Sequence, residues 1–76
     1  MKYIIELEDA LDHCTTLGEY NSLDDAQLFF EKTIADGPDT YDLSVELAQV
    51  DGDHWETLEY HEWFTEEEWA AAHPDD

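Results

Sequence analysis

The feature that most constrains this chain is its charge. Twenty-two of its 76 residues are Asp or Glu, and only Lys2 and Lys32 oppose them, which gives a formal net charge of −20 at pH 7. Like charges repel one another in a compact state and weaken it. A chain of this length also buries only about 60% of the surface that its unfolded form exposes, so its core is thin. Any fold must therefore gather its few apolar residues together and leave the carboxylates in solvent.

The apolar content is nevertheless that of a globular protein. Hydrophobic residues make up 42% of the sequence and aromatic residues 13%, whereas disordered chains are poor in aromatic and β-branched residues. We therefore expect one acidic domain over residues 1–76, with Asp75 and Asp76 frayed at its end.

The charge also excludes several kinds of partner. Direct binding to DNA or RNA phosphates needs Lys and Arg in number, and an anionic membrane repels the chain for the same reason. No apolar run approaches the ~20 residues of a transmembrane helix. Residues 1–6 turn acidic too early for a signal peptide, and the single cysteine, Cys14, fits a reducing compartment. We expect a cytoplasmic protein with a cationic partner, and proteins that hold nucleic acid are the commonest cationic partners.

Hydrophobic periodicity predicts two strands and a helix in the first half of the chain. Alternation over residues 1–7 and the Thr-rich segment 14–20 each indicate a strand. The apolar spacing from Leu23 to Ile34 predicts a helix, whose first turn the Ser22 hydroxyl is expected to cap. Gly37, followed by a proline, should end that helix.

The second half predicts a hairpin and a short helix. Residues 41–48 alternate between apolar and polar, and Asp51-Gly52 is a type I′ hairpin signal. With that two-residue loop, Val45 pairs with Leu58 and Leu43 with Tyr60; a four-residue loop, 51–54, keeps the same alternation. Thr65 and Glu68 match a capping box, and Pro74 closes the helix. The predicted class is α+β, an antiparallel sheet with a helix packed on one face, in the order β-β-α-β-β-α.

The same alternation predicts that one face of the sheet is acidic. Side chains on one face of a strand repeat about every 6.8 Å and strands lie about 4.8 Å apart, so two acidic strands approach the charge density of a nucleic-acid strand. The acids expected on this face are Glu6, Glu8, Asp42, Glu46 and Glu59, with Ile4, Trp55 and Trp63 beside them. The first helix adds Asp24, Asp25 and Glu31, and the C-terminal part adds Glu62, Glu66, Glu67 and Glu68. These residues form the predicted partner-binding site, unless the last helix folds back and Trp69 covers the other two tryptophans.

No catalytic or metal site is expected. The sequence has no nucleophile elbow or phosphate-binding glycine loop, and a chain this small has little interior for a catalytic carboxylate pair. Residues 51–62 match a calcium loop only in part, because Trp55 and Glu56 stand where a ligand and a glycine are needed. The four histidines lack the paired spacing of a zinc site, and Cys14 is expected to be a buried structural residue. We therefore expect no enzyme activity, no cofactor and no bound metal.

Taken together, these features resemble the phage-encoded DNA mimics of the anti-restriction and anti-CRISPR kind. Small size, extreme acidity, a β-β-α-β-β core and the lack of catalytic motifs carry the resemblance over the whole chain. The residues on which it rests include Asp24, Asp25, Glu31, Asp42, Glu46, Glu59, Glu66, Glu67 and Glu68. No motif defines that group, so no role of an individual residue follows from it. The resemblance implies an inhibitor that occupies the cationic groove of a CRISPR effector, a restriction enzyme, a DNA glycosylase or a nucleoid protein.

Other interpretations stay open at this point. The chain is alternatively an acidic adaptor that contacts another protein through its sheet edge or its Trp-bearing surface, without mimicking nucleic acid. A domain from a high-salt cytoplasm would also be acidic throughout, and an acidic metalloprotein or enzyme is a further alternative. None of these interpretations fixes the oligomeric state.

Overall fold

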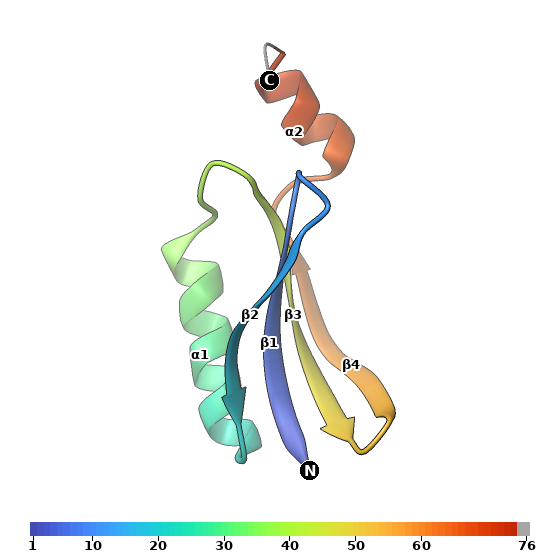
Figure 1. Cartoon of the computed structure of the whole chain (residues 1–76). Helices are drawn as coiled ribbons and strands as arrows, with labels where there is room; N and C mark the ends of the chain where they lie inside the picture. The colour runs from blue at the N-terminus through green and yellow to red at the C-terminus, as the bar shows by residue number, and fades with distance from the viewer. Residues whose placement is uncertain (75–76) are drawn as a thin grey trace.

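Four strands and two helices follow one another in a computed structural model that describes residues 1–74 (Figure 1). The elements are β1 (Lys2–Asp9), β2 (Cys14–Tyr20), α1 (Leu23–Asp36), β3 (Asp42–Asp51), β4 (His54–Glu62) and α2 (Glu66–Ala72). This confirms the α+β class and the order β-β-α-β-β-α. The expected fraying of Asp75 and Asp76 lies outside the described residues.

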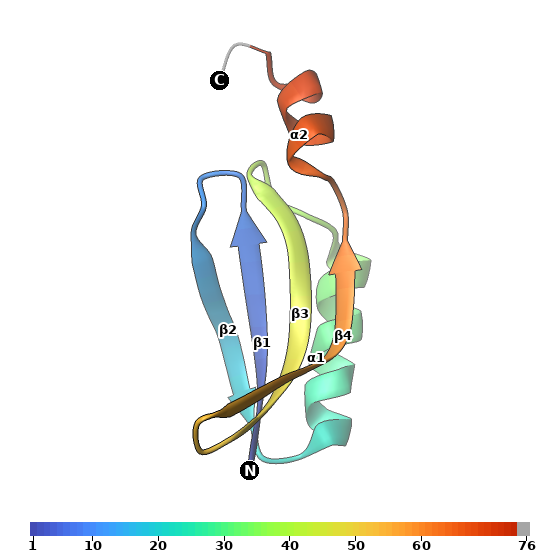
Figure 2. The same cartoon turned by 90° about the vertical axis from the view of Figure 1, so that its right-hand side faces the viewer.

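The strands form one antiparallel sheet in the order β2-β1-β3-β4. The helix α1 lies along one face of the sheet, which we call the covered face, and the opposite face is open (Figures 1 and 2). The short helix α2 stands beyond the end of the sheet (Figure 1). Within residues 1–74, no helix is long and apolar enough to cross a membrane.

The core lies between α1 and the covered face. Ile5, Val45 and Leu47 of the sheet are buried against Ala26 and Phe30 of α1. Around them pack the partly buried residues Tyr3, Leu7, Tyr20, Phe29, Ile34, Leu58 and Trp63. Because β1 and β3 are the two central strands, their alternating apolar side chains supply most of the buried surface of the sheet.

The helix ends follow the sequence signals with one exception. The Ser22 hydroxyl makes no capping hydrogen bond within residues 1–74, so that prediction is wrong; only the Ser22 carbonyl accepts the Ala26 N–H, at 3.1 Å. Gly37, with a φ of 81°, ends α1 as predicted. At α2 the capping box is confirmed, because the Thr65 hydroxyl accepts the Glu68 N–H at 3.1 Å and the Glu68 carboxylate accepts the Thr65 N–H at 3.2 Å.

Three β-bulges decide which face each side chain occupies. The extra residue is a leucine in each case: Leu17 in β2, Leu43 in β3 and Leu58 in β4. A bulge sets two residues opposite one, so the alternation of faces shifts by one residue beyond it. Two of the three bulges lie on the edge strands β2 and β4.

The bulge at Leu58 changes the predicted register of the hairpin. The chain turns through Gly52 and Asp53, and Val50 pairs with Trp55, which keeps the predicted alternation in the first part of the hairpin. Beyond Leu58 the pairing has moved by one residue. The observed pairs are Leu47–Glu59, Glu46–Tyr60 and Val45–His61. The predicted pairs Val45–Leu58 and Leu43–Tyr60 are wrong for two reasons: the turn lies one residue later than the predicted Asp51-Gly52 loop, which moves the pairing by two residues, and the bulge moves it by one more.

Candidate partner-binding face

The open face of the sheet is arranged in four cross-strand rows, and Figure 2 looks onto it. Running from β2 toward β4, the rows are Cys14, Glu8, Ser44 and Glu62; Thr16, Glu6, Glu46 and Tyr60; Glu19, Ile4, Ala48 and Thr57; and Lys2, Val50 and Trp55. Successive rows along a strand are about 6.8 Å apart. The first two rows are acidic and lie toward α2, whereas the last two are mostly apolar and lie toward the β3–β4 turn.

In the acidic rows, carboxylates face one another across strands. Glu6 and Glu46 are direct partners on β1 and β3, and like charges directly opposite one another weaken a sheet. The Thr57 hydroxyl donates a hydrogen bond to the Glu46 carboxylate. Between Glu8 and Glu62 lies Ser44, which is only 3% exposed, so the two carboxylates stand above a small buried side chain. The sheet thus holds four acids as one patch: Glu6, Glu8, Glu46 and Glu62.

Two exposed aromatic side chains lie on this face, Trp55 in an apolar row and Tyr60 in the second acidic row. Trp55 is 44% exposed, and Tyr60, at the border of the acidic patch, is 56% exposed. Ala48 lies in the row between them, opposite Ile4 and Thr57, and is fully buried. Aromatic residues of this kind are the side chains that most often dominate binding at protein interfaces.

The β3–β4 hairpin also shapes this face. Its tip turns away from α1, toward the open side of the sheet (Figures 1 and 2). A bulge bends a strand and increases its twist, and the bulge at Leu58 lies within this hairpin. The hairpin tip, which carries Trp55 close to the turn, is therefore bent toward the side on which the acidic patch lies.

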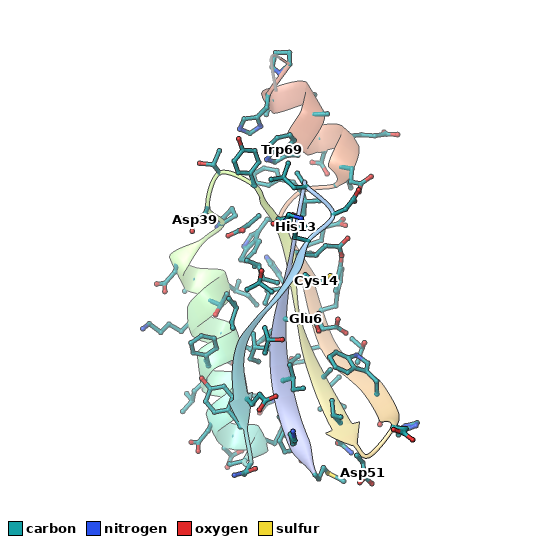
Figure 3. The ribbon with its side chains drawn as sticks, viewed as in Figure 1. Glu6, His13, Cys14, Asp39, Asp51 and Trp69 are labelled. Carbon is teal, nitrogen blue, oxygen red and sulfur yellow. The ribbon has the colours of Figure 1, made fainter. Side chains whose placement is uncertain are left out.

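Cys14 is affected by the charge of this face. It lies exposed at the start of the edge strand β2, directly opposite Glu8, so the expectation of a buried structural cysteine is wrong (Figure 3). Loss of solvent around the thiol raises the pKa of Cys14, and the nearby charges, with Glu6 and Glu8 first among them, raise it further. A thiol with a raised pKa stays protonated at neutral pH and is a poor nucleophile.

Three residues predicted on the acidic face lie on the covered side instead. Beyond the bulge at Leu58, Glu59 pairs with Leu47 and accepts a hydrogen bond of 3.4 Å from the Gln27 side chain on α1. Trp63 continues the same shifted alternation and packs against the core.

Asp42 is displaced by the bulge at Leu43. It pairs with Asp9 on β1, and its side chain lines a groove together with Leu7 and Phe29 on the covered side. The predictions for Glu6, Glu8 and Glu46 on the open face are confirmed, as are those for Ile4 and Trp55.

The remaining predicted residues lie away from the sheet. Asp24, Asp25 and Glu31 are exposed on α1, and Glu66 and Glu67 are exposed on α2. The structure therefore divides the predicted site into an acidic patch on the open face and two separate acidic surfaces on the helices. Sequence reasoning missed Tyr60, because without the bulge its position belongs to the covered face, and it also missed Glu19, which lies opposite Ile4 on β2.

The helix α2 is attached through Trp69. The indole N–H of Trp69 donates to the carbonyl of Thr40 at 2.7 Å, and its ring lies 5.4 Å from that of Tyr41 and 4.3 Å from that of His73 (Figure 3). Trp69 thus packs on the loop before β3. The alternative that it folds back over Trp55 and Trp63 is wrong.

Two further observations concern chemistry and relatives. Among the described residues, no three His, Cys, Asp or Glu side chains come together in a way that could hold a metal ion. Comparison of the chain with protein-family models, with curated proteins and with solved structures finds no match. The function of the open face must therefore follow from its own chemistry.

Proposed function

We propose that this protein is an inhibitor that mimics the charge of nucleic acid and occupies the cationic groove of a nucleic-acid-binding protein in the cytoplasm. The observation that carries the proposal is charge density. The molecule is 42 Å long and has a net charge of −20, which is about one charge for every 2 Å, against one per about 1.7 Å of axis in double-stranded DNA. A groove that neutralises phosphates meets a similar density of charge on this chain.

The acidic patch supports the proposal because it weakens the fold that carries it. The facing pair Glu6 and Glu46 costs stability in a domain with a thin core. A small domain that keeps such a pair gains from it elsewhere, and attraction to a cationic partner is the gain that this chemistry offers. The patch acts by charge and shape and catalyses no reaction.

Aromatic residues beside the patch add short-range contacts to the long-range attraction. Charge steers the encounter and raises the association rate. Trp55 and Tyr60 then bury apolar surface against the partner, as aromatic anchors do at the centre of an interface. The proposed targets are a CRISPR effector, a restriction enzyme, a DNA glycosylase or a nucleoid protein.

An adaptor that binds by adding a strand to the sheet is disfavoured. Both edge strands contain a bulge, at Leu17 in β2 and at Leu58 in β4. Bulges and charged side chains are the devices by which proteins prevent pairing at sheet edges. The adaptor that remains would use the Trp55 surface, and it differs from a mimic because nucleic acid does not compete for its partner.

The test begins with capture of the partner from a bacterial lysate, in the presence and absence of competing DNA. We expect DNA to displace the captured protein, and purified partner to bind either this chain or nucleic acid. A partner that binds both at once would contradict mimicry and support the adaptor.

Charge reversal then locates the surface. Glu6→Lys with Glu46→Lys should weaken binding at least about 100-fold, because like-charge contacts across an interface cost several kcal/mol. The control Asp24→Lys with Asp25→Lys makes the same change of net charge on α1 and should weaken binding less than about 10-fold. If the first variant is folded and binds at full strength, the open face is not the mimic surface. The acids of α1 or α2 would then be tested.

A further inference from the structure

A groove on the covered side lies outside the acidic patch. It has a volume of about 200 Å³ and lies between the second half of α1, the strands β1 and β2, the start of β3 and the residue that follows β4. Its apolar lining comes from Leu7, Leu17, Phe29 and Trp63. Apolar grooves with a few charged groups at the rim are typical of binding sites rather than of ordinary surface.

Two of the three bulges build this lining. Leu17 is the extra residue of the β2 bulge, and it stays 36% exposed at the groove instead of entering the core. Trp63 reaches the covered side because the bulge at Leu58 has shifted the alternation before it. Because of these two bulges, the aliphatic side chain of Leu17 and the aromatic side chain of Trp63 line the same groove.

The rim of the groove is acidic. Asp36 is the last residue of α1, Asp39 follows in the loop, and Asp42 begins β3; all three line the groove. The Asp39 N–H donates to the Asp42 carboxylate at 2.9 Å, and the Asp42 N–H donates to the Asp39 carbonyl at 3.2 Å. These two bonds fix the turn that carries the acids, while the Asp36 and Asp39 carboxylates stay exposed.

One cation opposes these acids. Lys32 lines the same groove and lies four residues before Asp36 on α1, a spacing at which opposite charges attract. Three carboxylates against one ammonium leave the rim negative, so the groove attracts a second cation. An anion would be repelled, and a purely apolar ligand would leave the carboxylates without a partner.

We propose that this groove binds an arginine side chain of the cationic partner. The inference rests on the proposed function, since that function requires a partner rich in basic residues. An arginine stem is aliphatic and can pack on leucine, and its planar guanidinium stacks on aromatic rings and forms paired hydrogen bonds with carboxylates. A lysine ammonium is a compact, strongly hydrated charge and uses the aromatic lining less well. The open face thus supplies charge density, and the groove selects a particular side chain.

The first test uses small probes and needs no partner. N-acetyl-arginine amide, N-acetyl-lysine amide and N-acetyl-norleucine amide are titrated into the labelled protein, and amide and indole shifts are followed by NMR. We expect arginine to shift the backbone amides of Thr33 and Gly37 and the indole of Trp63, with smaller shifts from lysine and none from norleucine. Equal shifts from arginine and lysine, spread over all acidic surfaces, would overturn the proposal.

The second test uses the captured partner and matched variants. Asp36→Asn with Asp39→Asn should weaken binding about tenfold, whereas Asp24→Asn with Asp25→Asn makes the same charge change at the other end of α1 and should weaken it less than about threefold. Lys32→Gln removes the competing cation and should strengthen binding about threefold. Asp42 is left intact in all variants because its carboxylate holds the turn.

The two proposals fail in different ways. If DNA still displaces the partner but the rim and control variants bind alike, the arginine groove is wrong and the mimic stands. If DNA does not displace the partner but the rim variant still loses binding, mimicry is wrong and the groove stands.

Discussion

The two faces of the sheet contribute differently to the fold. On the covered face, Ile5 and Leu47 are fully buried against α1, and the apolar residues of the core cluster gather there. On the open face, Glu6 and Glu46 face each other and Trp55 stays in solvent. The covered face therefore stabilises the fold, and the open face destabilises it. The comparison shows how a small domain keeps a net charge of −20 and still folds.

Two neighbouring isoleucines test this comparison most directly. Ile5 points to the covered face and is fully buried, whereas Ile4 points to the open face and is half-buried. We expect Ile5→Ala to lower the free energy of unfolding by about 2–5 kcal/mol and Ile4→Ala by about 1 kcal/mol. Urea unfolding of both variants measures the difference. Equal losses would mean that the open face is part of the core.

Salt tests whether repulsion between the carboxylates weakens the fold. Raising NaCl from 10 to 150 mM shortens the Debye length from about 30 to 8 Å. The resulting gain of about 1 kcal/mol should raise the melting temperature by roughly 4–8 °C in a domain of this size. Calorimetry across that range of NaCl concentration measures the change in melting temperature. A flat melting temperature would contradict the repulsion, and a need for molar salt would favour a halophilic domain.

A single amide substitution should sharpen the comparison. Glu6→Gln removes the like charge opposite Glu46 and should raise the free energy of unfolding by about 0.5 kcal/mol at low salt. Glu56→Gln changes the net charge equally, but Glu56 faces Gln49, so its effect should be smaller. Chemical unfolding at 10 and 300 mM NaCl compares the two. If the free energy of unfolding rises equally in both variants at low salt, the net charge causes the destabilisation rather than the facing pair Glu6 and Glu46.

The smallest expected effect concerns the rate at which the Cys14 thiol is alkylated. Because partial desolvation and the charges of Glu6 and Glu8 raise the pKa of its thiol, less thiolate is present at pH 8 than in an ordinary cysteine. Iodoacetamide should therefore alkylate Cys14 more slowly than N-acetylcysteine amide. Glu8→Gln should lower the pKa and speed the reaction about twofold, while Glu56→Gln should leave the rate unchanged. An unchanged rate in Glu8→Gln would show that the charge of the patch does not reach the thiol.

The elements could be predicted because their signals are local. The apolar spacing of α1, the glycine that ends it and the capping box of Thr65 and Glu68 each depend on residues close in the sequence. The order of elements followed from them. The class of fold was therefore accessible without any knowledge of contacts between distant residues.

The faces beyond the bulges could not be predicted, and Leu58 shows why. In a regular strand Leu58 belongs to the covered face, and in the bulge it still packs against the core, so its own position gives no sign of the irregularity. Only the residues that follow change sides, which places Glu59 and Trp63 with α1 and Tyr60 in solvent. Packing against α1 decides whether the strand is regular or bulged at Leu58. The alternation of residues along one strand contains no information about that packing.

The strand order has a consequence for synthesis of the chain. β1 is made before β3 but lies inside the sheet, and this second partner begins only at Asp42. Until then the nascent β1–β2 hairpin has an unpaired inner edge, which is a template for aggregation with other unfinished chains. Glu6 and Glu8 lie on that edge strand and act as gatekeepers, because charged residues within an apolar strand oppose such pairing. The acids of the acidic patch on the open face thus also oppose pairing between nascent copies of the chain.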